Sequence, residues 1–163
     1  MTEVNLSRVA IILLFAISFA IIGTFAPVLY ATYTPESSIV EVHSFEAQST
    51  TTQSQQHYVC FDRTVHQPAT GKVFTELYLV DKNENRVEVD SRTMQRYFQE
   101  GRAGVVTPFS LPDDIKSGEY TYLLVIRMEL ADGRVTRDFA YTSDTFTVTK
   151  GESMNQTAPH CRL

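Results

Sequence analysis

The sequence has no tryptophan, only two cysteines and no recognisable catalytic motif. It contains no Gly-rich phosphate loop, and no serine lies in the strand-to-helix turn that exposes a hydrolase nucleophile. The neighbouring carboxylates Asp113 and Asp114 precede a glycine corner, a setting that is typical of turn residues. We therefore expect that the chain is not an enzyme and that it uses no cofactor.

Basic residues are also scarce. The chain has 14 basic and 19 acidic residues, for a formal net charge of −5. This balance argues against nucleic acid as a general partner and against a polybasic surface that binds lipid headgroups.

One long stretch, Val9 to Ala31, has 23 residues and no charge. As a helix it would rise roughly 34 Å, which is enough to cross a bilayer core of about 30 Å. A cleaved signal peptide is the alternative, but its apolar region is only about 7–15 residues long. Cleavage after Ala26 would place Pro27 beside the scissile bond. The stretch predicts an uncleaved membrane anchor, with Pro27 at a position where it can kink or end the helix.

The charges that flank this stretch predict its orientation. Arg8 precedes it, whereas Glu36, Glu41 and Glu46 follow it, and the next basic residue is Arg63. The positive-inside rule therefore favours a cytoplasmic N-terminus and an external C-terminal domain.

The chain divides into five expected parts. These are a cytoplasmic N-terminus (1–8), a transmembrane helix (9–31), a stalk (32–37), a β-rich ectodomain (38–150) and a polar C-terminal tail (151–163). About 130 residues remain outside the span, which is enough for one domain with a real core.

Alternating apolar and polar residues predict eight strands in the ectodomain. They are expected at 38–45, 57–65, 73–80, 86–90, 105–111, 120–130, 135–141 and 145–150. The polar stretch Gln48 to Gln56 is interpreted as a loop. Asp132-Gly133 is a strong signal for a type I′ hairpin between the sixth and seventh of these strands.

One segment, Ser91 to Glu100, breaks the strand rhythm. Its apolar residues have helical spacing, Ser91 can cap the start, and Gly101 follows the end, so we expect a short surface helix. Arg92 and Arg96 would share its outer face, and Tyr97 and Phe98 are two of its apolar residues. These four residues are candidates for a partner-binding patch, and an ordinary solvated face is the alternative.

Short strands separated by turns, with hardly any helix, indicate an all-β, antiparallel β-sandwich of 7–8 strands. The corner before Tyr120 resembles the approach to the sixth strand of immunoglobulin-like domains. In that family an apolar corner residue and a tyrosine hold the loop down, roles that the resemblance gives to Ile115 and Tyr120. The chain departs from true immunoglobulin domains in having no tryptophan and in placing Cys161 beyond the last strand.

The cysteines allow three interpretations. A disulfide between Cys60 and Cys161 suits an external compartment. Free thiols are a second possibility, and a zinc site of His57, Cys60, His160 and Cys161 is a third. Because residues three apart on a flat strand point to opposite faces, His57 and Cys60 can share a metal only across a bulge. We predict the disulfide and no metal, and note a glycosylation sequon at Asn155.

Together these features predict a single-pass protein that takes part in protein–protein interaction or assembly at the cell or virion surface. It would be an accessory subunit or an envelope protein, and its partners would be the bilayer and other membrane or surface proteins. The alternative is a glycan- or ligand-binding module, whose contact residues would be exposed aromatics: Tyr58, Tyr97, Phe98 and Tyr141. A metal or redox domain is the third hypothesis.

Overall fold

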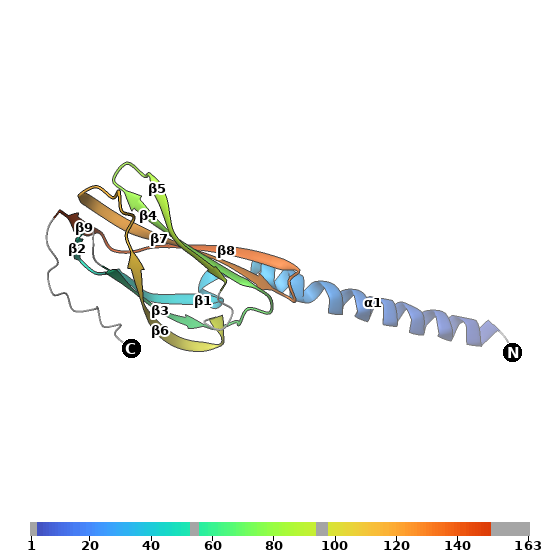
Figure 1. Ribbon diagram of the computed structural model, residues 1–163. Coiled ribbons are helices and arrows are strands. Elements are labelled where there is room, and N and C mark those ends of the chain that lie inside the picture. The colour runs from blue at the N-terminus through green and yellow to red at the C-terminus, as the bar shows by residue number, and fades with distance from the viewer. Residues whose placement is uncertain (1–2, 53–55, 94–97, 151–163) are drawn as a thin grey trace. The chain divides into compact units, whose positions relative to one another are not determined.

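The computed structural model describes residues 3–52, 56–93 and 98–150 (Figure 1). The chain separates into two compact units, Met1–Thr34 and Pro35–Leu163. The first unit is helical and the second is built almost entirely of strands, so each is described by itself.

The first unit is the helix α1, Glu3–Tyr33, which continues through Pro27 without a break. Its segment Val9–Tyr33 is long and apolar enough to cross a membrane. The hydroxyl groups within this segment donate to carbonyl oxygens one turn earlier: Ser18 to Leu14 at 2.9 Å and Thr24 to Ala20 at 2.7 Å. Such bonds satisfy polar groups that would have no water partner inside a bilayer. The helix is longer than the predicted 9–31, since it takes in the first residues of the expected stalk.

The second unit opens with a short 3₁₀ helix, η1, Glu36–Ser38, and continues as nine strands within the described residues. The strands are β1 Val40–Ala47, β2 Thr50–Thr52, β3 Gln56–Val65, β4 Val73–Asp81, β5 Arg86–Thr93, β6 Gly101–Ser110, β7 Gly118–Leu130, β8 Val135–Thr142 and β9 Phe146–Thr149. All eight predicted strands occur, with bounds shifted by a few residues.

These strands form two sheets. One has the order β1-β3-β6, and the other has the order β2-β9-β7-β4-β5, with β8 also paired to β7. Every described pair is antiparallel except β2 with β9, which is parallel. The unit is therefore mostly β, with mixed sheets.

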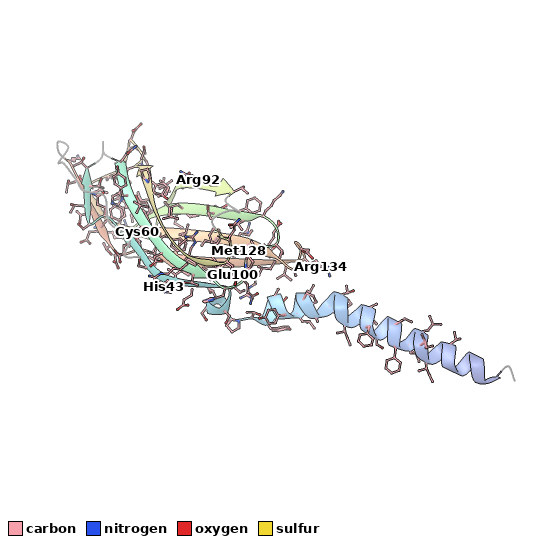
Figure 2. The ribbon with its side chains drawn as sticks, turned by 90° about the horizontal axis from the view of Figure 1, so that it is seen from below. His43, Cys60, Arg92, Glu100, Met128 and Arg134 are labelled. Carbon is pink, nitrogen blue, oxygen red and sulfur yellow. The ribbon has the colours of Figure 1, made fainter. Side chains whose placement is uncertain are left out.

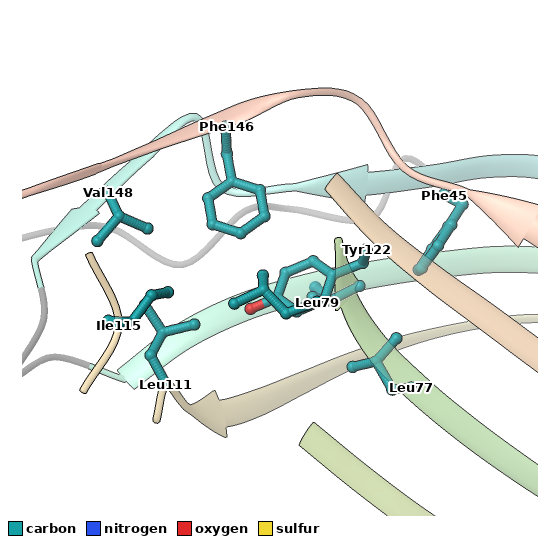
Figure 3. Packing of buried hydrophobic residues seen from close by; sticks show 9 residues of the cluster. Phe45, Leu77, Leu79, Leu111, Ile115, Tyr122, Phe146 and Val148 are labelled. Atoms are coloured by element: carbon teal, nitrogen blue, oxygen red, sulfur yellow. The ribbon is translucent and has the colours of Figure 1, made fainter. Parts of the chain in front are cut away.

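The core lies between the inner faces of the two sheets (Figure 3). Its members come from strands of both sheets and from the corner before β7: Phe45, Val59, Leu77, Leu79, Leu111, Ile115, Tyr122, Phe146 and Val148. Their alternation along each strand is the period-2 pattern that predicted the strands. The corner is fixed at both ends, because Ile115 is buried and the Tyr120 hydroxyl donates to the Lys116 carbonyl oxygen at 2.8 Å.

The predicted hairpin at Asp132-Gly133 is confirmed. Both residues have positive φ, 57° and 79°, and the Arg134 amide donates to the Ala131 carbonyl oxygen at 3.2 Å. These are the angles that a type I′ turn requires at its two central positions.

Two predictions about local structure are wrong. Residues 91–93, expected to begin a helix, complete β5, where Arg92 pairs with Thr75 and Thr93 pairs with Phe74. Residues 94–97 lie outside the described part of the chain. The expected loop 48–56 contains β2, whose parallel partners are Thr147–Thr149. In both places pairing with another strand prevailed over the local pattern.

Candidate functional site

A cavity of about 110 Å³ lies between the two sheets on the side where β5 and β6 are edge strands. Among the described pairings, β5 bonds only to β4 and β6 only to β3. The cavity is lined by Phe45, Val59, Phe61, Arg63, Thr75, Leu77, Asp90, Arg92, Phe98, Val105, Thr107, Phe109 and Leu124. Its position leaves it bordered by two strand edges with unused backbone hydrogen-bonding capacity.

Strand alternation builds most of the wall. Val59 and Phe61 point inward from β3, and their register partners on β6, Thr107 and Val105, face the same way. Most lining residues are apolar, and four of them are phenylalanines. The interior therefore favours an apolar group.

One wall carries a buried cation. Arg63 is only 1% exposed, and its Nη1 donates to the Ala103 carbonyl oxygen at 3.0 Å. The guanidinium carbon lies 5.3 Å from the ring centroid of Phe61 and 5.0 Å from that of Phe98. Contacts of this kind with ring faces help to keep a desolvated guanidinium charged.

A second guanidinium lies at the more exposed side of the cavity. Arg92 Nε bonds to Asp90 Oδ2 at 2.6 Å, and the group lies 5.9 Å from the centroid of Phe109. The lining thus holds two guanidinium groups, Arg63 and Arg92, and one carboxylate, Asp90. This local excess of positive charge contrasts with the net charge of −5 on the whole chain.

The structure brings two of the four predicted partner-binding residues to this cavity. Arg92 reaches it from β5 and Phe98 from the segment that precedes β6. Phe98 is only 3% exposed, so it belongs to the interior and is not the exposed contact residue that the sequence suggested. Arg96 and Tyr97 lie outside the described residues.

Sequence reasoning missed Arg63 and Phe109. Arg63 falls in the inward alternation of Val59, Phe61 and Val65, so the period-2 pattern contained a signal for a buried cation. No sequence signal indicated that β5 and β6, from separate sheets, would lie on the same side of the domain.

His57 faces the core, where its ring centroid lies 4.3 Å from that of Phe146, with the two rings tilted by 40°. Its Nε2 lies 2.7 Å from the Gln48 carbonyl oxygen, which can only accept, so Nε2 carries the proton. Nδ1 then accepts a hydrogen bond from the Tyr122 hydroxyl at 2.8 Å. Burial lowers the pKa of His57, although the bond to Gln48 acts in the opposite direction. With both ring nitrogens bonded, His57 has no lone pair left for a metal.

Cys60 points away from that core. Val59 and Phe61, its neighbours along β3, both pack inward, so the alternation places Cys60 on the outer face of the β1-β3-β6 sheet. The structure thus separates His57 from Cys60, and no group of three or more metal-ligating side chains occurs within the described ranges. His160, Cys161 and the sequon residue Asn155 lie outside those ranges, so the predicted disulfide and glycosylation stay predictions.

The three described aromatic residues considered for glycan binding, Tyr58, Phe98 and Tyr141, form no exposed platform. Phe98 is buried, and Tyr58 and Tyr141 are half-buried on different strands, β3 and β8. Tyr97, the fourth, is not among the described residues.

Comparisons with known proteins give little further information. No family model matches the chain, and no curated protein matches it. The solved structures that match include a ceramidase complexed with C2, at a TM-score of 0.43, and the neutral ceramidase from Pseudomonas aeruginosa, at 0.42. Each is 12% identical over 68% of this chain, which spans only 18% and 19% of their lengths.

The expectation that the chain is not an enzyme is corrected here, because two of the solved structures that match it are ceramidases, which are enzymes. That expectation rested only on the lack of a familiar catalytic motif, and such a lack does not exclude an enzyme. At these TM-scores the likeness in turn carries no argument for ceramidase activity in this chain.

Proposed function

We propose that this protein is a membrane-anchored binding module, whose β-rich domain holds another membrane or surface protein at the cavity between β5 and β6. In this proposal the N-terminus is cytoplasmic and the domain is external, as the charges around the span predict. The protein would act as an accessory subunit or as an envelope component of a cell or virion.

The proposal includes an immunoglobulin-like fold for the domain, supported by the strand order. The order β1-β3-β6 corresponds to strands A, B and E of that fold, and β5-β4-β7-β8 corresponds to a C′, C, F, G sheet. The Tyr120 hydroxyl bond to the Lys116 backbone corresponds to the tyrosine corner before strand F. The inter-sheet disulfide of antibody domains is replaced here by packing of His57, Tyr122 and Phe146.

The observation that carries the binding proposal is the aromatic cavity with two guanidinium groups between two edge strands. An extended segment of a partner can pair with a strand edge while one of its apolar side chains enters the cavity. Arg92 is partly exposed, with 45% of its side chain accessible, and can bond a carboxylate of that segment. The partner segment we propose is therefore a strand with an apolar anchor next to an acidic residue.

The test is extraction of the full-length chain from its native membrane in mild detergent, followed by mass spectrometry of the proteins that co-purify. A stoichiometric partner is the expected result. Arg92→Ala and Thr107→Leu should each reduce its recovery, the first by removing the charge and the second by filling the cavity. Arg86→Ala is the matched control, because Arg86 lies on the same strand but pairs with Val80, on the outer face. A chain that purifies alone, or a partner retained equally by all three variants, would contradict the proposal.

A further inference from the structure

The cavity between β5 and β6 places positive charge and apolar surface on the same wall. The Arg63 guanidinium lies over the rings of Phe61 and Phe98, and all three residues line the cavity. The bond from Arg63 to the Ala103 carbonyl oxygen fixes the position of the guanidinium, which is almost fully screened from bulk water. An anion therefore reaches this group from the cavity, where the low local dielectric constant strengthens the attraction.

The lining carries one more positive charge than negative charge. Among the described lining residues the one carboxylate, Asp90, is bonded to Arg92, which lies near the end of β5 (Figure 2). Because that pair is neutral as a whole, the net charge of the lining equals the charge of Arg63. A ligand that brings one carboxylate into the cavity makes the lining neutral, so charge complementarity favours such a ligand over an uncharged one.

The cavity has room for one side chain of moderate size. Its volume is about 110 Å³, whereas a protein cavity of about 150 Å³ is large enough to hold benzene. A branched aliphatic side chain, such as that of leucine or valine, therefore fits better than an aromatic ring. A second side chain from the same segment has no room beside the first.

Strand geometry then restricts the source of the carboxylate. In an extended segment the residues on either side of the anchor point to the opposite face, and the next residue on the same face lies about 6.6 Å further along. An acidic side chain of an internal segment thus cannot enter the cavity together with the anchor. The α-carboxylate of a C-terminal residue can enter, because it is attached to the same Cα as the anchor side chain.

We propose that the segment bound at this cavity is the C-terminus of the partner chain. Its last residue is aliphatic, with the side chain in the cavity and the α-carboxylate paired with the Arg63 guanidinium. The inference rests on the proposed function, since it names the kind of partner that the same site binds. Arg92, with 45% of its side chain accessible, remains the contact for the acidic residue next to the anchor, outside the cavity.

The first test compares two forms of one peptide. The pentapeptide TVTEL, labelled with fluorescein at its N-terminus, is made with a free C-terminal carboxylate and as the C-terminal amide. Each form is titrated with the full-length chain in mild detergent and followed by fluorescence polarisation, with empty micelles as the background. We expect the free acid to bind at least tenfold more tightly than the amide, as a lost charge-assisted hydrogen bond implies. Equal affinities, or no binding of the free acid at millimolar chain concentration, would overturn the proposal.

The second test assigns the carboxylate to Arg63. Arg63→Met keeps a long apolar side chain but removes the charge, so the acid and the amide should bind this variant with nearly equal affinity. Arg86→Ala, which removes an exposed arginine from β5, is the matched control and should keep the native preference for the acid. Near-ultraviolet circular dichroism of the tyrosines shows whether each variant is folded, and the comparison of the two peptides on the native chain needs no variant. A folded Arg63→Met that keeps the native preference would overturn the role of Arg63.

The result can be separated from that of the proposed function. Recovery of a partner from the native membrane does not depend on the peptide comparison. If the two peptides bind equally while a stoichiometric partner is still recovered, the terminal carboxylate is refuted and the binding function is not.

Discussion

Acidification should destabilise the β domain through His57, a group that the sequence suggested as a metal ligand. The imidazole is 0% exposed, donates from Nε2 to Gln48 and accepts at Nδ1 from Tyr122. Both bonds require the neutral ring, since a proton on Nδ1 would remove the acceptor that Tyr122 uses. Burial raises the pKa of the Tyr122 hydroxyl, which therefore stays a donor.

The sign and size of the effect follow from proton linkage. The pKa of His57 is lowered in the folded chain, whereas in the unfolded chain it lies near its ordinary value of 6.5. Below pH 6.5 the unfolded chain therefore binds a proton that the folded chain does not bind. The free energy of unfolding should fall by up to about 1.4 kcal/mol per pH unit, until the lowered pKa is reached.

The assay is chemical denaturation of the full chain in mild detergent, at half-unit steps from pH 7.5 to 5.5. Tyrosine circular dichroism in the near ultraviolet can follow unfolding, because the chain has eight tyrosines and no tryptophan. His57→Phe should be less stable at pH 7.5, because the Gln48 carbonyl and Tyr122 hydroxyl lose their partner, but should lose most of the pH slope. His66→Gln is the control, because it removes a histidine with an exposed side chain and leaves His57 and its two hydrogen bonds in place.

One result would refute this reasoning. If His57→Phe and the native chain lose stability equally between pH 7.5 and 5.5, the buried ring is not the source of the pH dependence. The lowered pKa assigned to His57 would then be wrong.

Three further changes test the packing of the domain. Asp62→Asn should cost about 1–3 kcal/mol, because the buried Asp62 accepts two bonds from Arg102, at 2.6 and 3.2 Å. The Arg102 bond lowers the Asp62 pKa in the folded chain. In the native chain the ionised carboxylate therefore stabilises the fold fully above about pH 4, and this stabilisation decreases as the pH drops below 4. The acid denaturation curve of Asp62→Asn should lack this decrease. Ile115→Ala should cost about 2–5 kcal/mol in urea denaturation, because Ile115 lies in the core cluster. Gly71→Ala should lower the midpoint of thermal unfolding and cost about 1–3 kcal/mol of stability, because a Cβ at this position would lie 2.5 Å from Glu129 Oε2. An unchanged midpoint would mean that the Glu129 side chain moves aside freely.

Much of the secondary structure was readable in the sequence because its signals are local. The uncharged run from Val9 predicts α1, and alternation predicts eight strands. Asp132-Gly133 predicts a turn that only residues tolerant of positive φ adopt easily. The opposite faces of His57 and Cys60 also follow from alternation alone, without any knowledge of the partner strands.

Only the tertiary structure decided which strands meet. The polar stretch around Thr50–Thr52 predicts a loop, and pairing with Thr147–Thr149 makes it a strand. The helical spacing around Ser91 likewise gave way to pairing with β4. The cavity has the same origin, because Arg63 is distant in sequence from Arg92 and Phe98 and meets them only where the edges of two sheets coincide. Side-chain periodicity is a property of a short segment, whereas register and sheet order depend on the whole chain. Most helices and strands could therefore be predicted from the sequence, but the cavity between β5 and β6 could not.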